Sequence, residues 1–420
     1  MLLKSRYFVI VAIFCLSRVA FAEDNHDHGA HSKSGSGFYG YLDAHIQADS
    51  HLDGDWLSKR FSEVYSHSHL ELGYRLKSGF SVNANIKLEG EPSGHAHGHG
   101  HGADEHAEEE REDEDHEDED HEDEDHEDED HEDEDHVAEK AHPAAAHDKV
   151  FKDHPLFIGT LTFNYDSEAF SAYIGKFNPV VGFNYHDFPG MYISQTVEHY
   201  GIRERVGFGM EVRQDLEDYG QHSLHVSSFF ADTALSDSVL RQRGNNSKED
   251  GGASNTEEFE SYSISVAGKD FYSLDNNIVE GLSYRVGHAT QAAADNNSRD
   301  EYRYSVSVGY KHIFSRNLNA RLVTEHMAIN NLGGEKSHDR SYNIMALRFN
   351  YKSWNWGTAY TFIDNTAEEE KENHDGHIVE LSAGYKFDNG VSLDVGYKRA
   401  DEENEESERI SSVIKYSYEF

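Results

Sequence analysis

The chain has little cysteine, little proline and no long apolar run, and each shortage excludes a class of structure. Its single cysteine, Cys15, lies in a segment that we expect to be removed, so the mature chain can form neither a disulfide nor a thiolate metal site. The 5 prolines and 34 glycines fit an all-β chain with tight turns. No segment approaches the ~20 apolar residues of a membrane-spanning helix, so a membrane crossing would require a barrel.

Basic residues are scarce too. The 37 lysines and arginines stand against 80 aspartates and glutamates, and the formal net charge of −43 disfavours binding to nucleic acid. The chain also has no nucleophile elbow and no H-E-x-x-H run, so we expect that it is not an enzyme. The 24 tyrosines and 23 phenylalanines argue against a disordered protein.

Residues 1–22 have the pattern of a secretory signal peptide. Two basic residues, Lys4 and Arg6, precede a short apolar stretch, and an Ala-x-Ala sequence that ends at Ala22 provides the cleavage site. An uncleaved N-terminal anchor is the alternative. After cleavage, residues 23–36 would form a histidine-containing periplasmic tail, and residues 37–420 would form the β-barrel predicted below.

The mature chain alternates apolar and polar residues almost throughout. In the stretch that begins at Gly79, "GFSVNANIKLEGE", every second residue from Phe80 to Leu88 is apolar and the residues between them are polar. This period of two predicts β-strands with one apolar and one polar face. Short connections such as Asp388-Asn389-Gly390 alternate with long polar ones such as 236–256 and 402–408, as in transmembrane barrels with short periplasmic turns and long external loops.

We therefore predict an all-β fold, a transmembrane antiparallel β-barrel of about 16 strands. It would have long external loops and one disordered loop, rich in His, Asp and Glu, at about 91–155. A secreted soluble β-sandwich or barrel is the alternative. The predicted strands are 38–48, 64–76, 80–90, 156–166, 169–177, 201–213, 223–235, 258–269, 278–292, 301–313, 318–329, 342–351, 354–364, 377–387, 391–401 and 409–420.

A signal peptide, sixteen alternating strands and a last strand that ends in Phe420 together resemble Gram-negative outer-membrane porins. The resemblance rests on architecture and covers most of the mature chain. In such porins the third external loop folds into the barrel and narrows it. The matching connection here is about 178–200, which is more aromatic and less charged than the other long loops. The resemblance implies the Gram-negative outer membrane as location, membrane lipid as surroundings and a homo-trimer as a candidate assembly.

The most unusual segment combines histidine with dense acidic charge. A run of alternating histidines, "HAHGHGHG", begins at His95, and from Asp104 to His136 the sequence holds 25 acidic residues, one arginine and a histidine at every fifth position of an unbroken repeat. Neither a helix nor a strand would gather histidines at this spacing on one face, and the carboxylates repel each other. We expect an extended, disordered loop.

Histidine is what distinguishes this segment from a solvated charge run. Calcium needs only oxygen ligands, whereas imidazole suits Zn²⁺, Cu²⁺, Ni²⁺ and Co²⁺. Many weak, linked sites would raise the local ion concentration. The candidate metal ligands are His95, His97, His99, His101, His106, His116, His121, His126, His131 and His136.

Two smaller groups are further candidates. On the polar faces of the first two strands lie Asp43, His45, His67 and His69. A symmetric turn across 49–63 would place His45 near His67 and Asp43 near His69, in the lumen, where they could bind metal or be ordinary polar residues. The N-terminal tail holds His26, His28 and His31, which could receive an ion from the pore or belong to an ordinary polar tail.

These features predict an outer-membrane channel for uptake of divalent transition metal ions, and zinc is the ion that we expect. The external loop would capture the ion, and an acidic lumen would favour cations. We expect no tightly bound cofactor, and a periplasmic metal-binding protein is a candidate partner. One alternative is a general solute porin with a metal-buffering loop. Another is a zinc-responsive receptor of the TonB-dependent type, which the His-rich loop resembles, although 23–36 is too short for the plug of that class.

Overall fold

The computed structural model describes residues 36–54, 61–90, 149–151, 154, 156–231, 251–271, 281–367, 374–402 and 405–420. The predicted signal peptide, the N-terminal tail with His26, His28 and His31, and the ten candidate histidines between His95 and His136 lie outside these residues. Their predicted roles are therefore untested by the fold.

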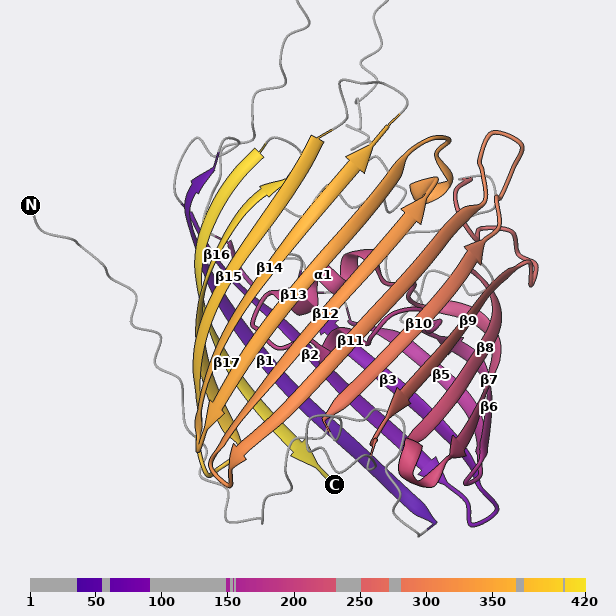
Figure 1. The fold of residues 1–420 in the computed structure, drawn as a ribbon, viewed down its shortest axis with the longest axis horizontal. Helices are drawn as coiled ribbons and strands as arrows, with labels where there is room; N and C mark the ends of the chain where they lie inside the picture. The colour runs from indigo at the N-terminus through magenta and orange to yellow at the C-terminus, as the bar shows by residue number, and fades with distance from the viewer. Residues whose placement is uncertain are drawn as a thin grey trace, which may run out of the picture.

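The strands form one closed antiparallel barrel (Figure 1). The sheet has 17 strands, of which β4 (Lys149–Val150) is a two-residue strand that pairs in parallel with β2. The other 16 form the wall, and the ring closes because β1 (Gly37–Gly54) pairs with both β2 (Ser62–Arg75) and β17 (Glu405–Glu419). The predicted fold class and strand number are therefore confirmed.

Each predicted strand range overlaps one strand of the wall. The remaining strands are β3 (Phe80–Glu89), β5 (Leu156–Asp166), β6 (Phe170–Phe177), β7 (Arg205–Asp215), β8 (Gln221–Ala231), β9 (Ser261–Lys269), β10 (Leu282–Gln291), β11 (Glu301–Ser315), β12 (Leu318–Asn330), β13 (Asp339–Tyr351), β14 (Trp354–Thr366), β15 (His374–Lys386) and β16 (Val391–Glu402).

Several predicted strand ends were wrong by three residues or more, as in β1, which continues to Gly54, and β13, which begins at Asp339. Two further differences change the connections. The long connection expected at 402–408 does not exist, because β16 and β17 stay paired up to Glu402 and Glu405. Backbone hydrogen bonds continue the ladder there, and Arg399 lies 3.1 Å from Glu406, which offsets part of the acidic repulsion. The strand expected at 201–213 begins at Arg205 instead, because a helix occupies the residues just before it.

Helices are short and few among the described residues. They are η1 (Tyr185–Asp187), α1 (Ile193–Tyr200), η2 (Glu217–Tyr219) and η4 (Leu332–Gly334). None of the helices in the described ranges has the length and apolar character needed to cross a membrane.

The alternation of side chains gives the barrel an apolar outer surface. On β11, Val306 is 52% exposed, whereas its neighbours Ser305 and Ser307 point inward and are buried. Aromatic residues gather near the short-turn end of the outer surface, where the rings of Trp354, Tyr385 and Phe387 touch in sequence. An outward apolar band next to aromatic residues is the form of a transmembrane barrel.

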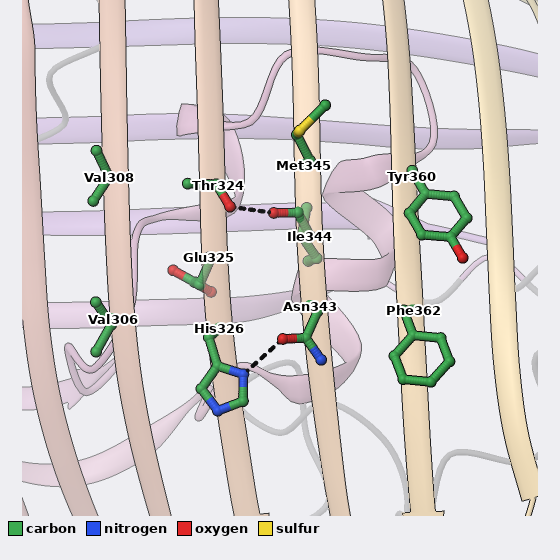
Figure 2. A pocket seen from close by; sticks show the side chains of 10 residues that line it. All are labelled: Val306, Val308, Thr324, Glu325, His326, Asn343, Ile344, Met345, Tyr360 and Phe362. Carbon is green, nitrogen blue, oxygen red and sulfur yellow. Dashed lines mark hydrogen bonds between the residues drawn. The ribbon is translucent and has the colours of Figure 1, made fainter.

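A shallow hollow on this outer surface lies over β11 to β14 (Figure 2). It is bordered by apolar side chains such as Val306 and Met345. Two polar residues also line it, and His326 Nδ1 lies 2.9 Å from Asn343 Oδ1, so these side chains bond to each other. The exposed side chains that border the hollow, such as Val306 and Met345, point away from the lumen.

A charge placed on the outer surface should destabilise the barrel. Val306→Arg would put a cation on the apolar outer surface, and we expect it to reduce the free energy of unfolding in lipid vesicles by about 2–4 kcal/mol. Urea titration of folding, followed by tryptophan fluorescence, measures the loss. The matched variant Asn83→Arg places the same side chain in the lumen and should cost far less. Equal losses would contradict the assigned faces.

Candidate metal site in the lumen

The connection between β6 and β7 folds into the barrel. Its side chains Phe188, Ile193 and Val197 are buried in the main hydrophobic cluster together with wall residues such as Val323 and Ile344. Figure 1 shows α1 inside the ring of strands. The prediction that about 178–200 folds into the barrel and narrows the lumen is confirmed. The segment is apolar, and it is stabilised when its side chains pack against the wall and leave water.

Buried carboxylates of the wall hold this lumen loop, residues 178–204, in place. Glu325 of β12 accepts hydrogen bonds from the Phe183 N–H at 2.8 Å and from the Tyr200 hydroxyl at 2.7 Å. Glu380 of β15 accepts from the Tyr192 N–H at 3.2 Å. Since Tyr192 precedes α1 and provides no side-chain cap, Glu380 satisfies a free N–H at the start of the helix and complements its dipole.

A cationic anchor holds the same helix from β17. Arg409 donates to Gln195 Oε1 at 3.0 Å and to Asp49 Oδ2 at 3.3 Å, and its guanidinium lies 4.7 Å from the centre of the Tyr192 ring. The Tyr65 hydroxyl donates to the second partner of the arginine, Asp49, at 3.0 Å. With anchors on β12, β15 and β17, the loop is held along the arc of the wall from β12 to β17.

The first two strands bring the predicted lumen residues together as expected. Asp43 pairs with His69 across β1 and β2, and the rings of His45 and His67 lie 5.8 Å apart. Between these pairs the His45 N–H donates to Ser68 Oγ at 2.9 Å. The Ser68 side chain therefore replaces a backbone carbonyl as the acceptor at this point of the β1–β2 pairing. The predicted register is confirmed, whereas metal binding by these residues stays a prediction.

The sequence analysis did not identify two candidate metal ligands, Glu89 and Glu198. His67 Nε2 lies 3.6 Å from Glu89 Oε1 and 3.6 Å from Glu198 Oε2, and among the described residues these three side chains form a group with the spacing of a metal site. Glu89 ends β3 on the same polar face as Lys87, so alternation alone could have placed it in the lumen. Glu198 lies on α1, and only the folded loop brings it to the wall.

The lumen loop adds a fourth imidazole to those of His45, His67 and His69. Asn184 and Asp187 form a capping box at η1. The Asn184 side chain accepts a hydrogen bond from the His186 N–H, and the Asp187 side chain accepts one from the Asn184 N–H. This turn fixes His186, whose ring lies 6.0 Å from that of His69. The lumen therefore presents His45, His67, His69 and His186 along one side.

Two cations border the His67–Glu89–Glu198 cluster. Lys87 Nζ lies 3.2 Å from Glu89 Oε1, and Arg203 lies 3.3 Å from Glu198 Oε1. Burial by itself raises the pKa of Glu198, but Arg203, His67 and Lys87 together outweigh it and lower that pKa to about 2. Burial lowers the pKa of the neighbouring His199 to about 4, with Arg203 and Lys398 acting in the same direction. Glu198 therefore stays ionised, and His199 neutral, near pH 7.

The opposite side of the lumen mixes arginines with buried carboxylates such as Glu325, so the described part of the lumen carries charges of both signs. Arginines of β10, β11 and β12 reach the loop from the wall: Arg285 donates to the Gly182 carbonyl, Arg303 to the Tyr200 carbonyl and Arg321 to Asp187. The excess of acid in the composition belongs mainly to the segment from Asp104 to His136. The lumen thus has a side with imidazoles and carboxylates and a side with arginines and carboxylates.

Removal of the main loop anchor should widen the channel. Glu325→Ala leaves the Phe183 N–H and the Tyr200 hydroxyl without their acceptor, at a cost of about 1–3 kcal/mol for each group. We expect higher and noisier single-channel conductance in planar bilayers. The control is Glu211→Ala, which removes a lumen carboxylate whose partners, Arg213 and His225, belong to the wall. The same conductance change in both variants would contradict the anchoring role.

The low pKa of Glu198 predicts an unusual acid response. Because the folded pKa lies below the ordinary value, the contribution of the ionised carboxylate is complete above about pH 4.3 and is lost only as the pH falls towards about 2. Glu198→Gln should therefore shift the reversal potential of a salt gradient towards anion selectivity both at about pH 7 and at about pH 3.5, where an ordinary glutamate is mostly protonated. A shift that vanishes at the lower pH would contradict this assignment.

Comparisons with known proteins give likeness in fold only. No family model and no curated protein sequence matches the chain. Among solved structures, OpdL of Pseudomonas aeruginosa is similar at 9% identity and a TM-score of 0.48, over 92% of this chain and 99% of that one. A loop-deletion mutant of OmpT, an outer-membrane protein of Vibrio cholerae, is similar at 10% identity and a TM-score of 0.46, over 91% and 98%. OprD of P. aeruginosa follows at 8% identity and a TM-score of 0.45, over 93% and 98%.

Proposed function

We propose that this protein is an outer-membrane channel for the uptake of divalent transition metal ions, with zinc as the expected ion. The observation that carries the proposal is the His67–Glu89–Glu198 cluster, which lies where the lumen loop meets the wall. One imidazole nitrogen and two carboxylate oxygens are a ligand set that suits zinc and its neighbours. A pore built only for neutral solutes has no need of such a group in its constriction.

The described residues on either side of the predicted metal-collecting segment, residues 95–147, support the proposal. The chain leaves the wall at Gly90, whose N–H donates to the Ser66 carbonyl at 2.9 Å. It returns through β4, where the Phe151 N–H donates to the Val64 carbonyl at 2.8 Å, and His154 Nε2 accepts from the Ser66 N–H at 2.9 Å. The described residues that flank this part of the chain, Gly90 on one side and Phe151 and His154 on the other, are thus bonded to residues 64–66, next to His67.

This tethering gives the segment a physical role. Ions that leave weak sites on a tethered segment are released close to the lumen cluster, so their effective concentration at the entrance exceeds that in the medium. The negative charge of the segment attracts cations over about 8–10 Å at physiological salt. Histidines release bound metal as they protonate near pH 6, which keeps the capture reversible.

The arginine side of the lumen favours one rival function. Arg285, Arg303 and Arg321 would attract small anions, so a general solute porin with a metal-buffering external segment is the second candidate. Zinc movement through the pore separates the two. A TonB-dependent receptor, a homo-trimer and a periplasmic metal-binding partner stay predictions of the sequence.

Deletion of residues 95–147 tests the proposal. In liposomes that carry the purified barrel, we expect zinc-65 uptake to fall several-fold at submicromolar zinc and to be nearly unchanged at millimolar zinc, because a collector matters only when the ion is scarce. The measurement is the initial uptake rate over this concentration range.

A full-length variant provides the matched control. Substitution of asparagine for the ten histidines from His95 to His136 keeps the acidic charge and removes the imidazoles, and should behave like the deletion. If this variant matches the unmodified protein, charge rather than histidine collects the ion. If small sugars enter and zinc does not, the protein is a general porin.

A further inference from the structure

We infer that His67, Glu89 and Glu198 together bind one divalent transition metal ion while it passes through the pore. They form a single transient binding site (the station) between the barrel wall and the lumen loop. This inference rests on the proposed function, since it names the place at which the channel selects its ion. The ligands come from three elements: His67 from β2, Glu89 from β3 and Glu198 from α1. The ion class is a divalent transition metal with mixed nitrogen and oxygen ligation.

The spacing fits an ion better than it fits a hydrogen bond. His67 Nε2 lies 3.6 Å from each carboxylate oxygen, which is too long for a hydrogen bond. In a tetrahedral zinc site with metal–ligand distances of about 2.0–2.2 Å, two ligand atoms lie about 3.3–3.6 Å apart. All three ligand atoms are within 4.8 Å of one another, so an ion needs only small side-chain movements to contact each of them.

A fourth ligand is within reach. His45 faces His67 with a ring separation of 5.8 Å, and its Nε2 atom is buried without a hydrogen-bond partner among the described residues. A buried imidazole nitrogen without a partner is costly unless something occasionally satisfies it. Rotation of His45 towards the cluster would complete two nitrogen and two oxygen ligands, and water would otherwise fill the fourth position.

The two neighbouring cations make the station weak. Lys87 contacts the same Glu89 oxygen that faces His67, so an entering ion must displace the ammonium group. Lys87 Nζ also lies 4.0 Å from Glu204, which offers it a second partner while the ion is bound. Arg203 takes one oxygen of Glu198 and leaves the other towards His67. Conduction requires binding that is favourable enough for entry and weak enough for exit.

The test is single-channel recording of the full-length protein in planar bilayers in potassium chloride, with micromolar zinc chloride added on the side of the long loops. A bound zinc ion should interrupt the potassium current briefly. We expect His67→Ala and the isosteric Glu198→Gln to raise the half-blocking zinc concentration at least tenfold. Lys87→Met should lower that concentration and lengthen each interruption. Magnesium chloride at the same concentration should give no interruptions, because an imidazole ligand does not favour it.

The matched control is His225→Ala, which removes a lumen-facing histidine that contacts the single carboxylate Glu211 at 2.9 Å, and it should block like the unmodified channel. The inference is overturned if the unmodified channel shows no interruptions, if His67→Ala blocks at the unmodified concentration, or if magnesium blocks as well as zinc. Block through His67 without zinc-65 entry would uphold the station and refute uptake. Zinc entry that is indifferent to His67 would uphold the channel and refute the station.

Discussion

The structure depends on one constraint, which is that every backbone N–H and C=O in an apolar layer needs a partner within the protein. A closed sheet meets this requirement because β1 pairs with β17 as well as with β2, so no edge is left open. Closure also decides where side chains go. Since successive residues of a strand point to opposite faces, apolar residues cover the outside and polar residues must share the lumen.

That crowding of polar groups makes the site possible. Histidines 22 residues apart in sequence, His45 and His67, become neighbours because two adjacent strands pair in a fixed register. The lumen loop then adds what the wall lacks. Its apolar residues are buried against Val323 and Ile344, while wall groups such as Glu380 and Arg409 bind its polar backbone and side chains. Glu198 is thereby delivered to His67 as a consequence of packing.

Charge is distributed differently in the predicted external segment and in the lumen. Acidic residues are concentrated in the segment from Asp104 to His136, whereas the lumen balances carboxylates with arginines such as Arg285 and Arg303. In the proposed channel the external charge would gather cations over a long range, and the lumen would select among them by ligand type at short range. A uniformly acidic lumen would hold divalent ions more tightly and release them more slowly.

The sequence by itself determined the barrel, its strand number and the pairing of Asp43 with His69, because these follow from local alternation and from a symmetric connection across 49–63. The inward turn of the β6–β7 connection was expected only from the resemblance to porins. It could not determine the end of β16, where acidic residues looked like a loop and backbone pairing prevailed. Nor could it assign Glu198 or His186 to the lumen site. Their positions depend on how a loop packs against strands more than a hundred residues away, and only the tertiary structure decides such contacts.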